Sequence, residues 1–412
     1  MSEWKEVSLS ELGKTITGKT PSSQYPEDFG DEVPFITPSD SFEKKYISKS
    51  ERFLSRSGSE RLKDKIISSD SIMVTCIGSA MGKVAKNSLP SVTNQQINSI
   101  IVNEKFDSDY IYYLFKNNYA VFRNAASGST AIPILNKTDF DNLRFKVELD
   151  LNEQRKMVSI LSKIDDKIEI NNQINQELEA MAKTLYDYWF VQFDFPDQNG
   201  KPYKSSGGKM VYNPELKREI PEGWGVTKLN EVVDLISGYP FSSNDYVTSG
   251  KYKLYTIKNV QDGYTVDKVD NYLDFLPSNM SDECQLRRGD LIMSLTGNVG
   301  RVGMVYEDDV LLNQRVLKLN PINKTHKSFI YSFFRSDVTK AHLENMSTGT
   351  SQKNLSPIDI GNMMIPFPSE SLLSKFLDNL NMLENNFVEN QQLTQLRDWL
   401  LPILMNGQVK VE

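Results

Sequence analysis

Few residues in this chain have the types and spacing that catalysis needs. Pro196-Asp197, followed by Glu215 and Lys217, match a loose nuclease pattern of two carboxylates and a lysine around a metal ion. The stretch is rich in proline, glycine and lysine, which favours a linker over the paired strands that would hold a metal. A self-contained nuclease is therefore the weaker interpretation.

The motifs for phosphate binding and methyl transfer are incomplete. Gly78-x3-Gly82-Lys83 is one residue short of a P-loop, and Val84 stands where a Ser or Thr would hold magnesium. Asn213-Pro214-Glu215 lacks the second proline and the aromatic residue of the adenine-methyltransferase tetrapeptide. The sequence thus predicts that this chain binds no cofactor.

Histidine and cysteine are too scarce to build a catalytic or metal site. His326 and His342 are the only histidines, and Cys76 and Cys284 stand 208 positions apart. These residues supply neither a Ser-His-Asp set nor a cysteine-rich metal cluster. We therefore expect a chain that is not an enzyme and binds no metal.

Length and composition indicate a multidomain globular protein. The 412 residues are 39% hydrophobic and 25% charged, with a formal net charge of −7. This charge argues against a generally basic protein that coats nucleic acid, although a near-neutral domain can still carry a basic face. No apolar run approaches the roughly 18 residues of a membrane span, and the N-terminus shows no signal segment. The expected location is the cytoplasm, without a membrane partner.

The chain carries one sequence frame twice. Four residues of the first copy, Trp4, Leu9, Glu11 and Gly18, recur at an offset of 220 as Trp224, Leu229, Glu231 and Gly238. Further pairs at offsets of 219 to 221 are residues 70–73 with 290–293, 94–95 with 313–314, and 127–130 with 348–351. Because the offset between matched residues changes by so little over 130 positions, the repeat indicates a duplicated domain whose loops have diverged.

Each copy is predicted to be a compact α+β domain. Short β-branched runs predict strands at residues 66–67, 72–74, 97–102, 252–260 and 291–295. Short helices are expected at 108–118 and 327–336.

A long helix is expected after each domain, at residues 152–190 and 371–405. The early apolar spacing of 4, 3, 4 is typical of a coiled-coil seam, and each helix places an asparagine in it. We expect the two helices to pair, antiparallel, with pseudo-twofold symmetry. The predicted pairing residues of the first helix are Met157, Leu161, Ile164, Ile168, Asn171, Ile174, Met181 and Leu185. Those of the second are Phe376, Leu380, Leu383, Phe387, Asn390, Leu393, Leu400 and Leu404.

This organisation suits recognition of a split DNA site. A helix of some 37 residues spans roughly 55 Å, and half-sites one turn of B-DNA apart lie roughly 34 Å apart. Two related domains separated by such helices could touch one duplex twice. Their diverged loops would read two different half-sites.

Side chains suited to phosphates or base edges lie in the expected loops of both copies. The basic candidates are Lys19, Arg61, Lys63, Lys83, Arg301, Arg315 and Lys353. The polar candidates are Thr20, Asn94, Gln95, Ser129, Thr130, Asn313, Gln314, Thr350, Ser351 and Gln352. Each has a structural alternative, because charge runs are usually solvated, polar loops can be ordinary turns, and the asparagines could cap strands.

Several segments resemble the specificity (S) subunits of type I restriction–modification systems. Residues 152–172 (NEQRKMVSILSKIDDKIEINN) resemble the central helix of that family. The segments 189–196 (WFVQFDFP), 200–210 (GKPYKSSGGKM) and 400–407 (LLPILMNG), and the domain openings 4–9 and 221–224, are also similar. The resemblance covers essentially the whole chain.

The resemblance implies a non-catalytic DNA-specificity subunit that recognises a bipartite, asymmetric site in double-stranded DNA. It implies target-recognition domains at 1–150 and 224–370, spacer helices at 151–192 and 371–412, and a linker at 193–223. The implied partners are two modification (methyltransferase) subunits and restriction (translocase–nuclease) subunits. S-adenosylmethionine, ATP and Mg2+ would belong to those partners. The alternatives are a self-contained nuclease or methyltransferase, and a coiled-coil scaffold that ignores DNA.

Overall fold

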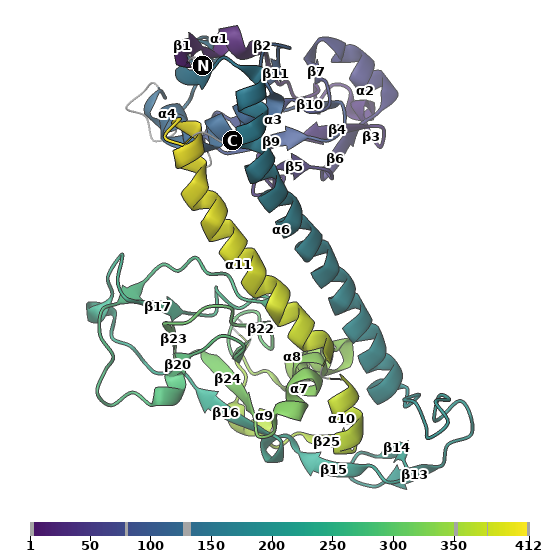
Figure 1. Ribbon diagram of the computed structural model, residues 1–412. Helices are drawn as coiled ribbons and strands as arrows, with labels where there is room; N and C mark the ends of the chain where they lie inside the picture. Colours follow the sequence, from purple (N-terminus) through teal and green to yellow (C-terminus); the bar gives the residue numbers. More distant parts are fainter. Residues whose placement is uncertain (1–3, 79–80, 127–132, 350–352, 377, 410–412) are drawn as a thin grey trace. The chain divides into compact units, whose positions relative to one another are not determined.

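The computed structural model describes residues 4–78, 81–126, 133–349, 353–376 and 378–409 (Figure 1). The chain forms two compact units. Unit 1 comprises Met1–Glu169 and Gln391–Glu412, and unit 2 comprises Ile170–Asn390. Each unit therefore contains one α+β domain and a portion of both long helices.

Unit 1 contains two mixed sheets. One orders its strands β2 (Gly13–Thr17), β11 (Ile97–Val102), β8 (Ile72–Thr75), β9 (Val84–Asn87) and β5 (Tyr46–Ile47). The other orders β3 (Phe29–Gly30), β6 (Arg52–Leu54), β4 (Val33–Ile36), β10 (Ser91–Thr93) and β7 (Ile66–Ile67). The ends of the domain meet where β1 (Trp4–Ser8) pairs antiparallel with β12 (Arg144–Glu148). Its short helices are α1 (Leu9–Leu12), α2 (Arg56–Arg61), α3 (Ser108–Asn117), α4 (Tyr119–Asn124) and α5 (Lys137–Asp141).

Unit 2 repeats this plan. One sheet orders β16 (Val233–Ser237), β24 (Val316–Pro321), β21 (Leu291–Ser294), β22 (Val302–Met304) and β18 (Gly263–Tyr264). The other orders β19 (Tyr272–Leu273), β17 (Tyr252–Tyr255), β23 (Val310–Leu312) and β20 (Gln285–Leu286), and β15 (Gly225–Lys228) pairs with β25 (Met364–Phe367). The short helices are α7 (Lys327–Arg335), α8 (Asp337–Met346), α9 (Pro357–Gly361) and α10 (Glu370–Phe376).

The matching strand orders confirm the duplicated α+β domain. The pairs β5–β9 and β18–β22 are both parallel, as are β4–β10 and β17–β23. One steric requirement explains why glycine occurs at the equivalent positions Gly18 and Gly238. A Cβ at Gly18 would lie 2.1 Å from the Asn94 carbonyl oxygen, and a Cβ at Gly238 would lie 2.1 Å from that of Asn313.

Most predicted elements are present, but the strand expected at 252–260 stops early. β17 ends at Tyr255 because Asn259 folds the chain into a turn. Its Oδ1 accepts from the Thr256 amide at 3.0 Å, and its Nδ2 donates to the Val266 carbonyl at 2.9 Å. An asparagine that satisfies turn backbone groups competes with strand continuation.

The two long helices are α6 (Leu151–Tyr186), which continues as a π-helical turn at Asp187–Val191, and α11 (Asp378–Met405). α6 has no internal proline or glycine and stops before Phe193, whose φ is 65°. α11 ends at Met405, two residues before Gly407, whose φ of 69° suits glycine. Within the described helices, none is both long and apolar enough to cross a membrane.

The helices run antiparallel where unit 2 holds them. Asn171 donates to Asn390 at 2.9 Å and Asn390 donates to Asn172 at 2.9 Å, while Asn386 donates to Asn175 at 2.9 Å. In unit 1, Arg397 of α11 bonds Asp165 of α6 at 3.0 Å. Met157 and Leu161 there share a hydrophobic cluster with Leu404. α6 and α11 therefore contact each other within each unit.

Two predicted pairing residues of α6 are wrong. Ile174 and Met181 are 40% and 52% exposed, and the buried side chains of this stretch are Asn175, Leu178 and Ala182. The 4, 3 spacing that begins at Met157 leads without interruption to these positions, so the polar Asn175 holds the place given to Ile174.

The other predicted pairing residues differ in their burial. Ile164, Asn171, Phe376, Leu380, Leu383 and Asn390 are buried. Ile168, Leu185, Phe387, Leu393 and Leu400 are half-buried. In the last turns of α11 the fully buried neighbour is Leu401, one position beyond Leu400.

The segment 193–223, predicted as a linker, contains a hairpin of β13 (Met210–Asn213) and β14 (Arg218–Pro221). It is held by aromatic stacking, because the Phe195 ring lies 4.7 Å from Tyr203 and 5.3 Å from Trp224. Asp197, the carboxylate of the nuclease pattern, accepts from the backbone amides of Asn199 and Lys201 at 2.8 Å. Its observed role is to close a turn.

Candidate nucleic-acid interface

Four predicted contact residues of unit 1 lie together at the turn between β10 and β11. Lys19 and Thr20 follow β2, and the Thr20 hydroxyl donates to Gln95 Oε1 at 2.6 Å. Thr20, Lys19 and Gln95 are exposed. Asn94 differs, because its buried carboxamide accepts from the Gln96 amide at 3.1 Å and donates to the Gln96 side chain at 3.1 Å. Asn94 therefore serves as a turn cap.

The equivalent turn of unit 2 joins β23 to β24. Asn313 is half-buried, and its backbone carbonyl accepts from Val316 at 2.9 Å. Gln314 and Arg315 are exposed, while the Arg315 carbonyl accepts from Leu295 at 3.0 Å. The backbone is thus fixed and these two side chains are accessible.

The basic candidates of unit 1 have different surroundings. Arg61 bonds the buried Asp28 at 2.5 Å, and its guanidinium lies 4.0 Å from the ring centroid of Tyr25. Lys63 is exposed. Lys83 donates to Glu43 Oε1 at 2.6 Å, and both side chains face solvent, 42% and 77% exposed. Exposed ion pairs such as this one stabilise a fold by at most about 1 kcal/mol, so a ligand can exchange them at little cost.

A hollow of about 640 Å3 in unit 2 brings together two predicted residues, Arg301 and Lys353. The Gly297–Arg301 turn forms part of its lining, and α8 adds Lys340 and Glu344. The remaining lining residues, Gln261, Asp262 and Tyr264, come from the segment before and within β18. The sequence analysis did not identify these three residues as candidates. The Gly-rich turn that lines the same hollow was a signal that could have pointed to them.

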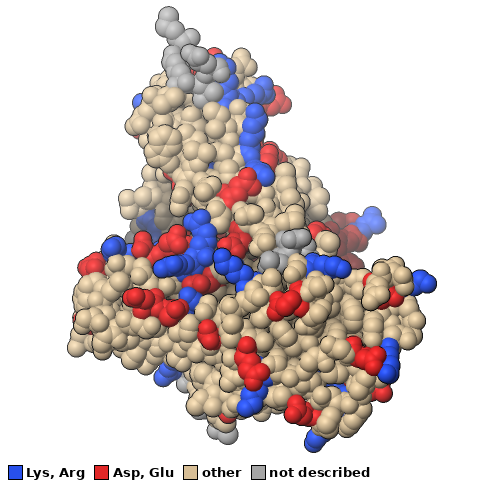
Figure 2. Space-filling view, turned by 60° about the horizontal axis from the view of Figure 1, so that its bottom comes forward, with Lys and Arg blue, Asp and Glu red and all other residues tan. Residues whose placement is uncertain are grey.

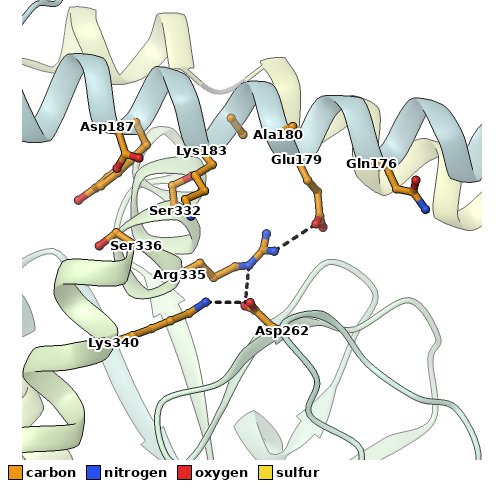
Figure 3. A pocket seen from close by; sticks show the side chains of 12 residues that line it. Gln176, Glu179, Ala180, Lys183, Asp187, Asp262, Ser332, Arg335, Ser336 and Lys340 are labelled. Atoms are coloured by element: carbon orange, nitrogen blue, oxygen red, sulfur yellow. Dashed lines mark hydrogen bonds and ion pairs between the residues drawn. The ribbon is translucent and has the colours of Figure 1, made fainter. Parts of the chain in front are cut away.

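One of the two acidic groups of this hollow, Asp262, is neutralised within its own unit. Asp262 accepts from Arg335 at 2.9 Å and from Lys340 at 2.8 Å, and Arg335 also bonds Glu179 of α6 at 3.1 Å (Figure 3). Burial alone would raise the pKa of Asp262, but the hydrogen bond from Lys340 and the charge of Arg335 lower it. The carboxylate stays ionised, and its charge is balanced. These contacts lie beside a second cavity, of about 290 Å3, between α6, α7 and α8.

Arg301 is placed by a tight turn. The Arg301 carbonyl accepts from the Ser294 amide at 3.0 Å, and Gly300, with a φ of 76°, donates to the Ser294 carbonyl at 2.9 Å. The half-buried guanidinium donates from Nη1 to Gln261 Oε1 at 3.2 Å. Because the partner is a neutral amide, Arg301 keeps its positive charge available to the hollow.

Acidic and basic side chains are interspersed on the face drawn in Figure 2, without one continuous basic surface. This distribution agrees with the net charge of −7. Affinity for phosphate therefore depends on individual cations in the loops.

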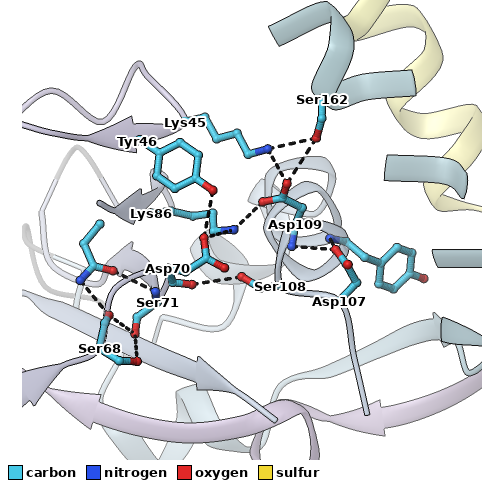
Figure 4. A network of polar contacts seen from close by, with 12 residues as sticks. Lys45, Tyr46, Ser68, Asp70, Ser71, Lys86, Asp107, Ser108, Asp109 and Ser162 are labelled. Atoms are coloured by element: carbon cyan, nitrogen blue, oxygen red, sulfur yellow. Dashed lines mark hydrogen bonds and ion pairs between the residues drawn. The ribbon is translucent and has the colours of Figure 1, made fainter. Parts of the chain in front are cut away.

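A polar network in unit 1 connects the sheet that contains β9 to α3 and α6 (Figure 4). The Lys86 ammonium is 1% exposed and lies 2.6 Å from Asp70, and it also bonds Asp109. Lys45 bonds Asp109 at 2.7 Å and Ser162 of α6 at 3.1 Å. Burial alone would raise the pKa of Asp109, but the charge of Lys86 and the hydrogen bond from Lys45 hold it below the ordinary value.

Five predicted contact residues lie outside the described residues: Ser129, Thr130, Thr350, Ser351 and Gln352.

Comparison with known proteins gives one consistent result. The family model of the type I restriction modification DNA specificity domain matches residues 1–180 and 221–396. The MjaIX type I specificity subunit of Methanocaldococcus jannaschii is 28% identical over 100% of this chain and 94% of its own length. The HindI specificity subunit of Haemophilus influenzae is 23% identical over 99% and 100%, respectively. The crystal structure of an S subunit from M. genitalium aligns with a TM-score of 0.54 at 17% identity, covering 98% of this chain and 96% of that one, which shows a shared fold.

Proposed function

Because the chain belongs to the family of type I restriction–modification DNA specificity domains, we propose that it gives such a complex its DNA sequence specificity. One observation carries this proposal. One five-stranded sheet has the same strand order in both units, while the side chains of their exposed loops differ. A chain with two related but unequal readers suits a split, asymmetric site in double-stranded DNA.

In this proposal exposed and half-buried loop side chains contact DNA. The candidates of unit 1 are Lys19, Thr20, Lys63, Lys83 and Gln95. Those of unit 2 are Arg301, Gln314, Arg315 and Lys353. Phosphate contacts would position each domain, and a smaller number of base contacts would select the sequence.

Catalysis and its cofactors belong to the partners. The chain is not an enzyme, and S-adenosylmethionine, ATP and Mg2+ would be bound by two modification subunits and by restriction subunits. The complex would act in the cytoplasm, where it would meet DNA.

The proposed docking surface for a modification subunit is an exposed apolar stripe on α6. Ile170, Ile174 and Met181 are 51%, 40% and 52% exposed and lie on one helix face. Exposed apolar patches on soluble proteins commonly mark interfaces.

Glutamates placed on this stripe should weaken assembly. We expect the double variant Ile174→Glu/Met181→Glu to lower co-purification with the cognate modification subunit at least about tenfold, because docking would bury unpaired carboxylates. Gln176→Glu, an exposed change on another face of α6, should leave it unaltered. If the double variant co-purified as well as the unaltered chain, this surface would be excluded as the docking site.

The function itself is tested by long-read methylation sequencing of cells that express this chain with its cognate modification subunit. We expect a gapped, asymmetric motif methylated on both strands that is absent without this chain. If the two proteins co-purify and no motif appears, the proposed specificity role is wrong.

A further inference from the structure

The two units place a cation at the same backbone position. Lys83 follows Gly82 and precedes β9, and Arg301 follows Gly300 and precedes β22. The Lys83 carbonyl accepts from Thr75 at 3.0 Å, and the Arg301 carbonyl accepts from Ser294 at 3.0 Å.

Both glycines before these cations have left-handed backbones, with φ values of 88° and 76°. The Gly82 amide donates to the Thr75 carbonyl at 2.8 Å, matching the 2.9 Å bond from Gly300 to Ser294. Lys83 and Arg301 are therefore structurally equivalent, although the loop before Lys83 is one residue longer.

The partners of these cations are equivalent as well. Glu43 and Gln261 lie in the segments that lead into β5 and β18, the strands that pair in parallel with β9 and β22. Strand register joins Tyr46 to Lys86 and Gly263 to Gly303, an offset of 40 in both units. The contacts Glu43–Lys83 at 2.6 Å and Gln261–Arg301 at 3.2 Å keep this offset.

We propose that Glu43–Lys83 and Gln261–Arg301 are equivalent base-reading pairs, each contacting a G·C base pair in its half-site. This inference rests on the proposed function. A lysine or arginine donates to guanine O6 and N7, and a glutamate accepts from cytosine N4 in the major groove. Lys83 with Glu43 thus matches the acceptor and donor groups of one G·C pair.

The hydrogen bonds around Arg301 preorganise its guanidinium for contact with a base. Gln261 accepts one of its N–H groups, and the guanidinium retains more than the two donors that guanine needs. Gln261 is itself fixed, because its amide donates to the Tyr264 carbonyl at 3.0 Å and its Nε2 donates to the Lys258 carbonyl at 3.1 Å. The neighbouring Asp262 is held by Arg335 and Lys340, which anchors the segment.

The two pairs occupy equivalent positions but differ in their hydrogen-bonding groups, as expected if the two units recognise different half-sites. Glu43 can only accept, so it can contact only a base with an exocyclic amine, cytosine or adenine, and Lys83 on the guanine edge selects cytosine, whereas the carboxamide of Gln261 both donates and accepts. We expect the stricter G·C requirement in the half-site that unit 1 reads.

The test is the methylated motif of cells that express the modification subunit with each variant. Lys83→Ala should relax one G·C position of one half-site, and Arg301→Ala should relax one G·C position of the other. The lost preference should be about 5- to 150-fold, the discrimination of one good base contact. Lys83→Arg should keep the preference. Lys137→Ala and Arg288→Ala, which remove exposed ion-paired cations from the same units, should leave the motif unaltered.

Methylation of duplexes that carry each of the four base pairs at the relaxed position gives a second measurement with the purified complex. Unchanged base preference in both alanine variants, or uniformly weaker methylation with no relaxed position, would overturn the base-reading role in favour of phosphate contact. Absence of any motif with the wild-type chain would instead contradict the proposed function.

Discussion

Replacing Lys86 by methionine should lower the free energy of unfolding of unit 1 by about 1–3 kcal/mol. The lysine is 1% exposed and bonds Asp70 and Asp109, so methionine keeps the volume but leaves two carboxylates without their shared cation. The loss stays below that of a fully buried ion pair, because Asp70 is 50% exposed and Asp109 keeps its bond to Lys45 at 2.7 Å. Urea unfolding at neutral pH measures the change.

Lys44→Met provides the matched control. Lys44 also bonds a carboxylate, Glu169 at 3.2 Å, but the two side chains are 50% and 44% exposed, and we expect a loss below about 1 kcal/mol. Adding Asp70→Asn and Asp109→Asn to Lys86→Met should restore part of the stability. A Lys86→Met protein as stable as the control would show that Lys86 does not neutralise these carboxylates.

Inserting one heptad into each long helix should lengthen the DNA spacer and leave both half-site sequences unchanged. The insertions belong between Glu169 and Ile170 in α6 and between Asn390 and Gln391 in α11, where the compact units divide, so that each unit keeps its internal contacts. Seven residues add about 10.5 Å of helix and about 20° of rotation. That rise corresponds to at most about three base pairs at 3.4 Å each.

The methylated motif reads out this change directly. An insertion in α6 alone serves as the control, because the two helices would then differ in length by seven residues, so that the Asn171–Asn390 contact of unit 2 and the Arg397–Asp165 contact of unit 1 could not both form, and methylation should be abolished. If the paired insertion altered the half-site sequences and kept the spacer, the helices would not set the distance between half-sites.

The sequence by itself determined the duplication and most of the elements. The repeat of Gly18 as Gly238 reflects a local requirement, since in each unit a carbonyl oxygen occupies the space of a Cβ. Helices α3 and α7 and strand β11 follow from local periodicity and β-branched runs, and their bounds agree with the prediction to within one residue. Local patterns of this kind do not depend on the rest of the fold.

In the interface between the two long helices, the sequence pattern and the tertiary packing favour different residues. Apolar character favoured Ile174 over Asn175, yet Asn175 is buried and bonds Asn386. The Asn175 side-chain oxygen accepts from Asn386, a partner that stands 211 positions away and that no local pattern indicates.

Tertiary structure alone decided which polar side chains the loop cations Lys83 and Arg301 contact. Lys83 and Arg301 were candidates from their residue type, but Glu43 and Gln261 carried no local signal. Each pair arises because two parallel strands align segments 40 residues apart in register, and that alignment is a property of the sheet. Residue type therefore indicates what a side chain can donate or accept, and strand register decides what it meets.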